Sequence, residues 1–270
     1  MAIKGIDVSK WNGVIDWGKV KNSGVDFVMI REGYGKKSPT QVDKKFRENI
    51  TQAQNYGINC GVYHYGYADS TKDAQDEAEF CLENIQNLKL EYPVVFDFED
   101  KETLKLSTRQ RTDICMAFLS EIEKNGYYAM IYANKSWLEN YLYATEILAK
   151  YDLWLAQWGP ENPSYNCGIW QYSETGRIDG INGNVDLNFA YKDYPFVMKR
   201  DGLNGFKRSN PISTNNAGPQ YFEYTVQKGD TLWDLAKKYL GNGARCKEIK
   251  ELNFLSSDTI YVGKTIKIPK

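Results

Sequence analysis

The amino-acid sequence predicts an α/β protein: an irregular β/α barrel of the TIM type, followed by a small α+β domain of βααβ order. Three observations support this prediction. Apolar runs of strand length recur about eight times before residue 198. Helical patterns separate several of these runs, which is typical of parallel strands joined by helices. The composition then changes after Met198.

The strand-like runs are rich in β-branched and aromatic residues and are short enough to be single strands. The segments that join the last three runs are too short for full helices, so we expect an irregular barrel. A doubly wound open sheet is the alternative. In both folds ligands bind at the carboxyl ends of the strands. The runs are residues 3–9, 26–33, 60–68, 92–100, 127–134, 152–158, 168–174 and 184–190.

Three helices are predicted between these runs. Apolar residues at helical spacing predict helices over residues 41–56 and 71–87. A third helix is expected to begin at Ser107, where Gln110 completes a capping box, and to end at Gly126.

The chain is expected to divide into a large domain at residues 1–198, a linker at 199–220 and a small domain at 221–270. The linker is polar, contains Pro and several Asn, and lacks periodicity. The last segment contains an alternating strand, two helices and a closing strand. That length is just sufficient for independent folding.

Composition excludes several classes of protein. The net charge of −1 argues against a nucleic-acid partner bound through its phosphates. No run approaches membrane-spanning length, and the N-terminus lacks the pattern of a signal peptide. The five cysteines are widely spaced and are expected to be reduced thiols. Because His64 is the only histidine, a His-rich metal site is excluded, and we expect no cofactor and no metal.

Residues 92–100, YPVVFDFED, combine a buried strand with acids at its end. Asp97 and Glu99 are two residues apart and should project to one face, about 6–7 Å apart along the strand. Phe96 and Phe98 should face the helices. Repulsion between the two carboxylates should raise at least one pKa, as a general acid requires. Alternatively, this acidic strand end only caps a helix or pairs with a Lys or Arg.

Two further acids, Asp7 and Asp186, lie in apolar runs at the first and last predicted strands. These strands are neighbours in a closed barrel, so all four acids could meet at one mouth. Four acids without metal-binding histidines point to glycoside hydrolysis. A site for a divalent cation is the competing interpretation.

Several segments resemble glycoside hydrolase family 25, the peptidoglycan lysozymes (N-acetylmuramidases) of phages and bacteria. They are GIDVSKWNG, GVYHY, FDFED, IYANKSW, WLAQW and IWQYSETGRIDGINGNVDLN, and the resemblance spans about residues 3 to 195. It implies that Glu99 is the general acid for the bond between N-acetylmuramic acid and N-acetylglucosamine. Asp97 would be its carboxylate partner, and Asp7 and Asp186 would complete an acidic floor.

The same resemblance suggests how Asp97 acts. In this family the substrate's own N-acetyl group is discussed as the attacking group, and Asp97 would orient or deprotonate it. The strand spacing fits that role better than direct attack, since an enzyme nucleophile usually needs carboxyls about 5–5.5 Å apart.

The resemblance also places four residues on cleft-lining segments as candidate sugar contacts, although core packing is an alternative for each ring. The segment IREGYG departs from the family pattern and leaves the roles of Arg31 and Glu32 open. The candidate contacts are Tyr63, Tyr132, Trp158 and Gln171.

Residues 221–270 resemble a LysM module, in YTVQKGDTLWDLAKKY and in LNFLSSDTIYVGKTIKIP. This implies binding of N-acetylglucosamine-containing glycans through two loops. Asp230 or Thr231 can also serve as a helix N-cap. The implied glycan-binding residues are Gly229, Asp230, Thr231, Leu232, Asn253, Phe254 and Leu255.

The sequence therefore predicts a peptidoglycan-cleaving enzyme anchored to the wall by its tail. We expect a phage endolysin that stays in the host cytoplasm until a holin gives it access to the wall, without inserting into a membrane. A bacterial autolysin of the same chemistry is the alternative. A non-catalytic glycan-binding protein is a third possibility, but a decayed enzyme should have lost Asp97 or Glu99.

Overall fold

The computed structural model describes residues 2–36, 38–208, 221–253, 255 and 257–269. The chain divides into two compact units, Met1–Asn210 and Pro211–Lys270. Each unit has its own hydrophobic core and is described separately.

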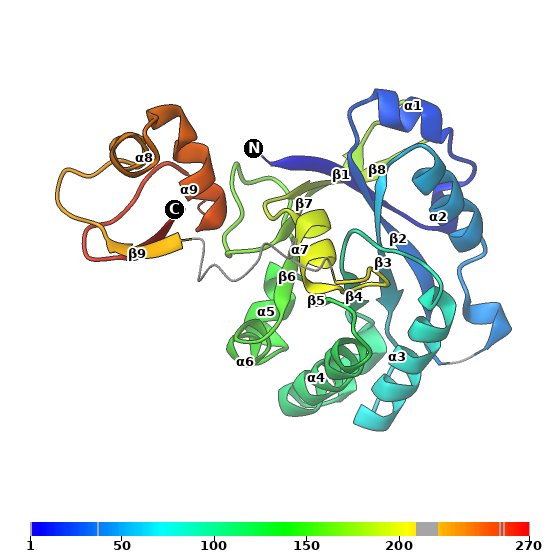
Figure 1. Ribbon diagram of the computed structural model, residues 1–270. Coiled ribbons are helices and arrows are strands. Elements are labelled where there is room, and N and C mark those ends of the chain that lie inside the picture. Colours follow the sequence, from blue (N-terminus) through cyan, green and yellow to red (C-terminus); the bar gives the residue numbers. More distant parts are fainter. Residues whose placement is uncertain (1, 37, 209–220, 254, 256, 270) are drawn as a thin grey trace. The chain divides into compact units, whose positions relative to one another are not determined.

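The first unit is a closed barrel of eight strands in chain order (Figure 1). Closure confirms the predicted barrel and rules out the open sheet. Strands β1 to β7 pair in parallel, whereas β8 is antiparallel to both β7 and β1. The strands are β1 (Ile3–Val8), β2 (Phe27–Tyr34), β3 (Asn59–Tyr65), β4 (Val94–Asp97), β5 (Ala129–Asn134), β6 (Asp152–Ala156), β7 (Ile169–Gly176) and β8 (Val185–Ala190).

The reversal of β8 is the main departure from the parallel pairing that the sequence predicted. Only residues 177–184 join β7 to β8, too few for a helical crossover, so the two strands form an antiparallel pair. The reversal has a consequence for the barrel mouth. In the register of β8 with β1, Asp186 lies opposite Asp7.

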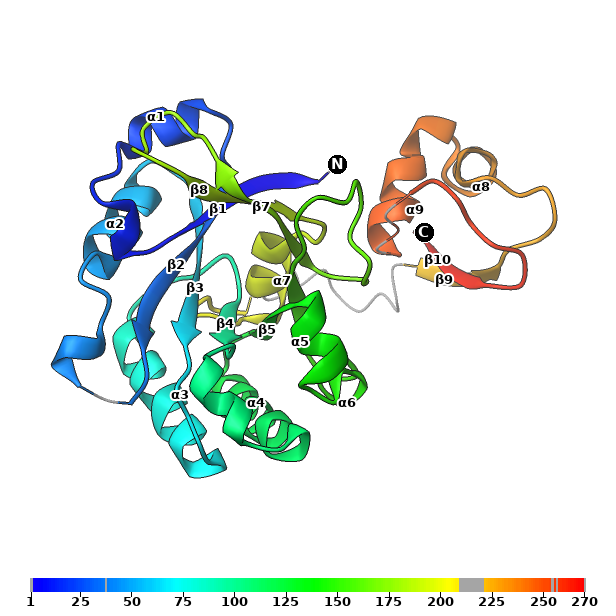
Figure 2. The ribbon, with the colours of Figure 1, turned by 180° about the vertical axis from the view of Figure 1, so that it is seen from behind.

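Helices cover the outside of the barrel, and α3 packs along α4 (Figure 2). The predicted start of the third helix is confirmed, because Ser107 and Gln110 form a complete capping box. The helices are α1 (Trp17–Asn22), α2 (Phe46–Asn55), α3 (Thr71–Ile85), α4 (Thr108–Lys124), α5 (Lys135–Asn140), α6 (Ala144–Leu148) and α7 (Tyr194–Asp201), with 3-10 turns η1 (Lys10–Asn12), η2 (Pro39–Gln41) and η3 (Lys101–Lys105).

Residues 199–208 belong to the first unit and not to a linker. The helix α7 runs on to Asp201, and Asn204 is fully buried after it. The Asn204 side chain accepts a hydrogen bond from Tyr128 N (2.7 Å) and donates one to Tyr92 O (2.8 Å), at the start of β5 and β4. Polar composition was misleading here, because the Asn204 amide satisfies backbone groups while Leu203 and Phe206 pack against the barrel core. The rest of the expected linker, 209–220, lies outside the described residues.

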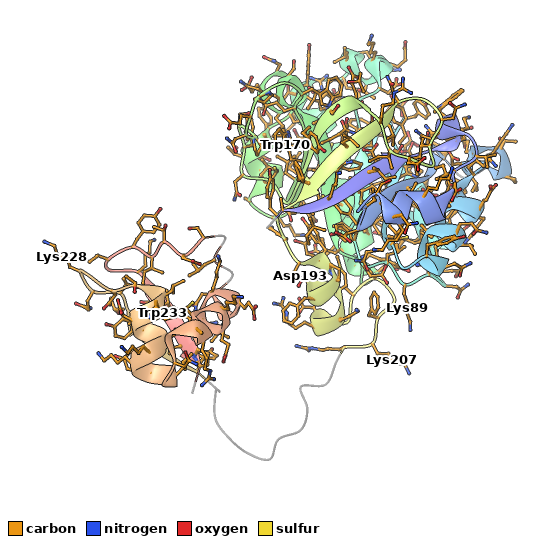
Figure 3. The ribbon with its side chains drawn as sticks, turned by 90° about the horizontal axis from the view of Figure 1, so that it is seen from above. Lys89, Trp170, Asp193, Lys207, Lys228 and Trp233 are labelled. Atoms are coloured by element: carbon orange, nitrogen blue, oxygen red, sulfur yellow. The ribbon has the colours of Figure 1, made fainter. Side chains whose placement is uncertain are left out.

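The same turn marks the end of the barrel where its strands begin. Gly205 approaches Leu88 O so closely that a Cβ there would lie 2.3 Å from it. Lys207 and Lys89 both project from this end (Figure 3).

The second unit has the predicted βααβ order. Its strands β9 (Tyr221–Thr225) and β10 (Thr265–Pro269) pair antiparallel, and between them lie α8 (Leu232–Leu240), η4 (Gly243–Arg245) and α9 (Cys246–Leu252). One small core joins both helices to both strands. Its buried members are Val226, Leu232, Leu235, Ala236, Ile249, Ile266 and Ile268.

All five cysteines are free, and four of them are buried. Within the described part of the chain, no helix is both long and apolar enough to cross a bilayer.

Candidate active site

The strand β4 delivers two carboxyls to the barrel mouth. Its side chains alternate, so Val95 and Asp97 face the barrel interior while Phe96 packs outward. Phe96 stacks on Phe118 of α4 with ring centroids 4.0 Å apart. Glu99 follows two residues after Asp97, just past the strand end. The outward aromatic residues thus anchor the strand whose end carries the acids.

Asp97 is almost completely buried, with 8% of its surface exposed. Burial raises its pKa well above the usual value, and the nearby charges of Glu99 and Asp7 raise it further. Its Oδ1 has no hydrogen-bond partner among the described residues. Because a buried polar atom without a partner is costly, this oxygen is available to a group that the substrate would bring.

Glu99 is half-buried beside β5. Desolvation raises its pKa, while a hydrogen bond from Asn134 Nδ2 to Oε2 (3.3 Å) acts in the opposite direction. The Asn134 Oδ1 caps α5 by accepting from Trp137 N. Asn134, which the sequence analysis did not single out, therefore fixes the position of Glu99 from a rigid helix start.

The third acid of the motif, Asp100, has a different role. It caps η3 by accepting a hydrogen bond from Glu102 N at 2.9 Å. The helix-cap interpretation thus holds for Asp100, whereas Asp97 and Glu99 line the mouth.

Asp7 and Asp186 form a second carboxyl pair across β1 and β8. Burial is the largest cause that raises the pKa of both acids, and the charge of Asp7 helps to raise the pKa of Asp186 to about 8. They are direct neighbours in the pairing of β8 with β1, so the ionisation of one disfavours the ionisation of the other. The structure therefore brings all four predicted acids together.

Two amides hold Asp7 in place. Its Oδ2 accepts hydrogen bonds from Gln171 Nε2 (3.0 Å) and Asn188 Nδ2 (2.8 Å). Trp154 Nε1 in turn donates to Asn188 Oδ1 at 2.8 Å. Asn188 was missed in the sequence analysis, although its position two residues after Asp186 places it on the same face of β8.

Gln171 lies in the mouth, but its side chain is already occupied. Its Oε1 accepts hydrogen bonds from Tyr132 OH and from Trp158 Nε1, each at 3.2 Å. Because its amide also donates to Asp7 and only 3% of its surface is exposed, it positions Asp7 and the two rings. A direct sugar contact at Gln171 stays a prediction, because these partners describe the side chain without a ligand.

The three candidate rings differ in exposure. Trp158 is 48% exposed and is open to a ligand. Tyr63 and Tyr132 are partly buried and pack edge-on against Trp154, with centroids 5.9 and 4.9 Å away. They serve both as packing for the barrel and as walls of the mouth.

Arg31 and Glu32, whose roles the sequence left open, lie in separate ion pairs. Arg31 binds the buried Asp43 at 2.7 Å. Glu32 is fully buried and bonds to His64 Nδ1, while His64 Nε2 lies 3.6 Å from Glu77 Oε2. His64 is thus enclosed between two carboxylates on the outer face of β3.

This buried cluster adjoins the active strand. Glu77 accepts hydrogen bonds from Tyr67 N (3.1 Å), and Gly66 N donates to Asp97 O (2.8 Å). The loop after β3 is therefore held between the cluster and β4. Glu32, His64 and Cys81 offer ligand atoms within 4.8 Å of one another, but His64 Nδ1 already bonds to Glu32.

In the second unit, several predicted glycan-binding side chains have structural roles. Leu232 is 2% exposed, and its side chain packs into the core of this unit. Asn253 joins α9 to β10 by accepting from Lys267 N at 2.6 Å. Asp230 accepts from Tyr224 OH and Gln227 N.

The remaining predicted residues lie at the two loops. Thr231 caps α8 by accepting from Asp234 N, as the N-cap interpretation expected. Gly229 is exposed and Leu255 is partly buried, while Phe254 lies outside the described residues.

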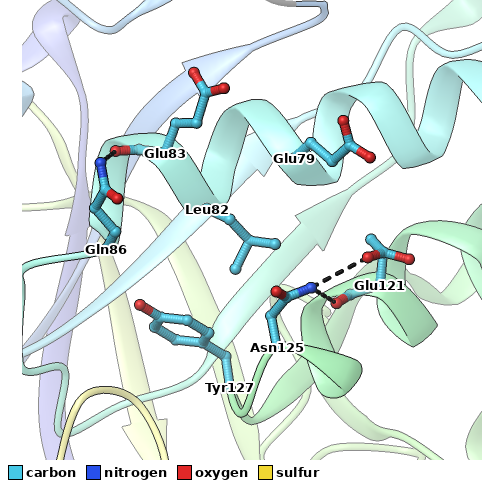
Figure 4. A pocket seen from close by; sticks show the side chains of 7 residues that line it. All are labelled: Glu79, Leu82, Glu83, Gln86, Glu121, Asn125 and Tyr127. Carbon is cyan, nitrogen blue, oxygen red and sulfur yellow. Dashed lines mark hydrogen bonds between the residues drawn. The ribbon is translucent and has the colours of Figure 1, made fainter.

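A groove on the outer helical layer has a cavity volume of about 510 Å³ (Figure 4). It lies between α3 and α4, and no strand end contributes to it. Its lining residues are Glu79, Leu82, Glu83, Gln86, Glu121, Asn125 and Tyr127. Because the paired acids lie at the barrel mouth, we assign the chemistry to the mouth and not to this groove.

Two families match the sequence. Residues 6–181 match the family described as glycosyl hydrolases family 25, and residues 224–269 match the LysM domain.

Lysozymes of two bacteria are among the relatives of this chain. Lysozyme M1 of Streptomyces globisporus is 30% identical over 200 residues, which cover 69% of this chain and 67% of that protein. The autolytic lysozyme of Clostridium acetobutylicum is 30% identical over 188 residues, which cover 69% of this chain and 55% of that protein.

Among solved structures, the CTP1L endolysin is similar with a TM-score of 0.63 and 28% identity. The similarity covers 73% of this chain and 69% of that one.

The buried cluster predicts a measurable titration of His64. Desolvation lowers its pKa, but Glu32 and Glu77 outweigh that effect and raise it from 6.5 to about 9. Protonated His64 should therefore contribute on the order of 3 kcal/mol to the free energy of unfolding. This contribution should be complete below pH 6.5 and should be lost as the pH rises through about 9. As the only histidine, His64 can be followed without ambiguity by NMR of its ring.

The matched variant is His64→Gln, measured by urea unfolding across the same pH range. Because Asp186, with a pKa of about 8, titrates in this range as well, the difference between the two proteins isolates the imidazole. That difference should shrink above pH 9. A folded-state pKa near 6.5, or a difference independent of pH, contradicts the ion-pair assignment.

Proposed function

This chain belongs to glycosyl hydrolases family 25, and from that premise we propose that it cleaves peptidoglycan between N-acetylmuramic acid and N-acetylglucosamine with Glu99 as the general acid. The chain is a lysozyme-type peptidoglycan hydrolase with a LysM domain. The observation that carries the finer proposal is the placement of Asp97 and Glu99 at the barrel mouth, where burial raises the pKa of both.

Glu99 suits the role of proton donor. A carboxyl in a desolvated site keeps its proton to higher pH and can transfer it to the glycosidic oxygen as the bond breaks. The hydrogen bond from Asn134 occupies Oε2, which leaves Oε1 to face the substrate. Because only the protonated form is active, turnover should fall as the pH rises through the raised pKa of Glu99.

Asp97 suits a role toward the substrate's acetamido group. Its unpartnered Oδ1 can accept the acetamide N–H, and this contact orients the acetyl oxygen for attack at the anomeric carbon. In its ionised form Asp97 would also stabilise the positive charge of the transition state. Asp7 and Asp186 form the floor beneath the sugar, and the raised pKa of both acids limits the negative charge that they add.

The biological setting is a finer proposal: the chain is a phage endolysin that reaches the wall when a holin opens the membrane. Its five free thiols suit synthesis in a reducing compartment. Both an endolysin and an autolytic lysozyme are similar to this chain, so a bacterial autolysin is the second candidate.

Substitution of the proton donor tests the chemistry. Glu99→Gln should lower kcat on peptidoglycan by about 10²- to 10⁴-fold, because the amide cannot donate the proton, while wall binding is retained. The matched control is Glu79→Gln on the outer face of α3, which should keep full turnover. Full activity of Glu99→Gln ends the general-acid assignment.

Removal of residues 221–270 tests the role of the second unit. The truncated protein should bind insoluble wall more weakly, because it loses the local concentration that a tethered binding module provides. Cleavage of soluble glycan fragments should stay within twofold of the intact chain, which serves as the internal control. Equal wall binding by both proteins rules out the module as an anchor.

Expression with and without a holin tests the biological setting. The chain is produced in a bacterium whose wall the purified enzyme digests. For an endolysin, the cells lyse only when the holin is co-expressed, and without it the enzyme stays in the soluble fraction. Enzyme that reaches the wall fraction without a holin favours the autolysin.

A further inference from the structure

A rigid turn at the barrel mouth presents an exposed tryptophan beside a lysine. Both belong to η1, which follows directly after β1 and its catalytic-site acid Asp7. Trp11 is 79% exposed, the most exposed large apolar residue of the described chain. The Lys10 ammonium lies 4.8 Å from the Trp11 ring centroid and 5.4 Å from that of Tyr34, within cation–π range.

Buried contacts fix this turn. Asp43, which is 2% exposed, accepts a hydrogen bond from Lys10 N at 3.1 Å and binds Arg31. Ser9 and Asn12 close a capping box around the turn. A side chain on such a turn loses little entropy when a ligand binds, so the exposed indole is preorganised for contact.

An aromatic strip connects the turn to the reacting acids. Tyr34 lies edge-on to Tyr67 with centroids 6.3 Å apart, and Tyr67 lies 5.2 Å from Tyr65. The Tyr65 OH donates to Asp100 Oδ2 at 3.4 Å, one residue from Glu99. The turn is therefore continuous with the catalytic mouth and not an isolated surface feature.

The charge of the turn complements the substrate. Peptidoglycan carries stem peptides with free carboxylates, and the four acids of the mouth would repel them. The Lys10 ammonium has no carboxylate within ion-pair distance among the residues that the structure describes. A cation without a counter-ion at the edge of an acidic site is suited to accept one from the ligand.

We propose that Trp11 and Lys10 form a substrate subsite in which the indole stacks on a sugar ring and the ammonium binds a carboxylate of the stem peptide. The proposal rests on the proposed function, and it deepens that function by assigning recognition of the peptide-bearing part of the strand. Tyr34 holds the lysine chain in position from below. Sugar stacking on an exposed indole is favourable because it buries apolar area at low entropic cost.

The test uses soluble glycan fragments that carry stem peptides but no wall phosphate. One sample keeps its free carboxylates, and in the other they are converted to amides by carbodiimide coupling. Lys10→Met keeps the apolar stem of the side chain and removes the charge. It should raise KM about threefold to tenfold on the free acid and less than twofold on the amide.

Three further variants complete the design. Lys10→Arg should restore the wild-type KM, because it restores the charge. Trp11→Ala should raise KM on both samples alike, since the sugar is common to them. Lys207→Met, at the opposite end of the barrel, removes an equal charge and should leave KM unchanged on both samples.

The outcomes separate the subsite from the function. If Lys10→Met affects both samples equally or affects neither, the peptide contact is wrong, while cleavage by the wild type still supports the hydrolase. If the wild type and Lys207→Met cleave neither sample, the proposed function and the subsite fail together.

Discussion

The constraint on which the site depends is the desolvation of four carboxyl groups at one end of a barrel. Burial raises the pKa of Asp7, Asp97, Glu99 and Asp186, and the charges of neighbouring acids raise the pKa of Asp97 and Asp186 further. Each of them therefore keeps its proton to a higher pH than an exposed carboxyl does. For a glycosidase this is useful, because a stored proton is what the leaving oxygen requires. The arrangement is stable only because amides, aromatic residues and a rigid strand hold the acids in place.

Support for the site comes from both faces of the barrel wall. On the inner face, the side-chain amides of Asn188 and Gln171 donate hydrogen bonds to Asp7. These two bonds hold the Asp7 carboxylate in a fixed position, whatever the charge of the neighbouring acids. On the outer face, Phe96 is stacked under α4, and the His64 cluster holds the loop whose Gly66 bonds to Asp97. Burying an ion pair there is costly in itself, and breaking it would leave an unpaired charge.

The sequence predicted what depends on periodicity. The alternation of side chains along β4 correctly predicted that the acids point inward and that Phe96 points outward. The capping box correctly predicted where α4 begins. The sequence could not predict features that depend on contacts between distant segments of the chain. The reversal of β8, the occupied amide of Gln171 and the burial of Asn204 each follow from tertiary partners that lie far away in the chain. Polar residues were interpreted as exposed or ligand-binding where they in fact satisfy buried backbone and carboxyl groups.

In the proposed mechanism, a protonated carboxyl at the mouth transfers its proton to the glycosidic oxygen between N-acetylmuramic acid and N-acetylglucosamine. The most direct measurement is mass spectrometry of the new reducing ends after the purified protein has digested peptidoglycan. This proton transfer predicts N-acetylmuramic acid at every new reducing end and no released peptide. New reducing ends of N-acetylglucosamine, or free stem peptides, would contradict it.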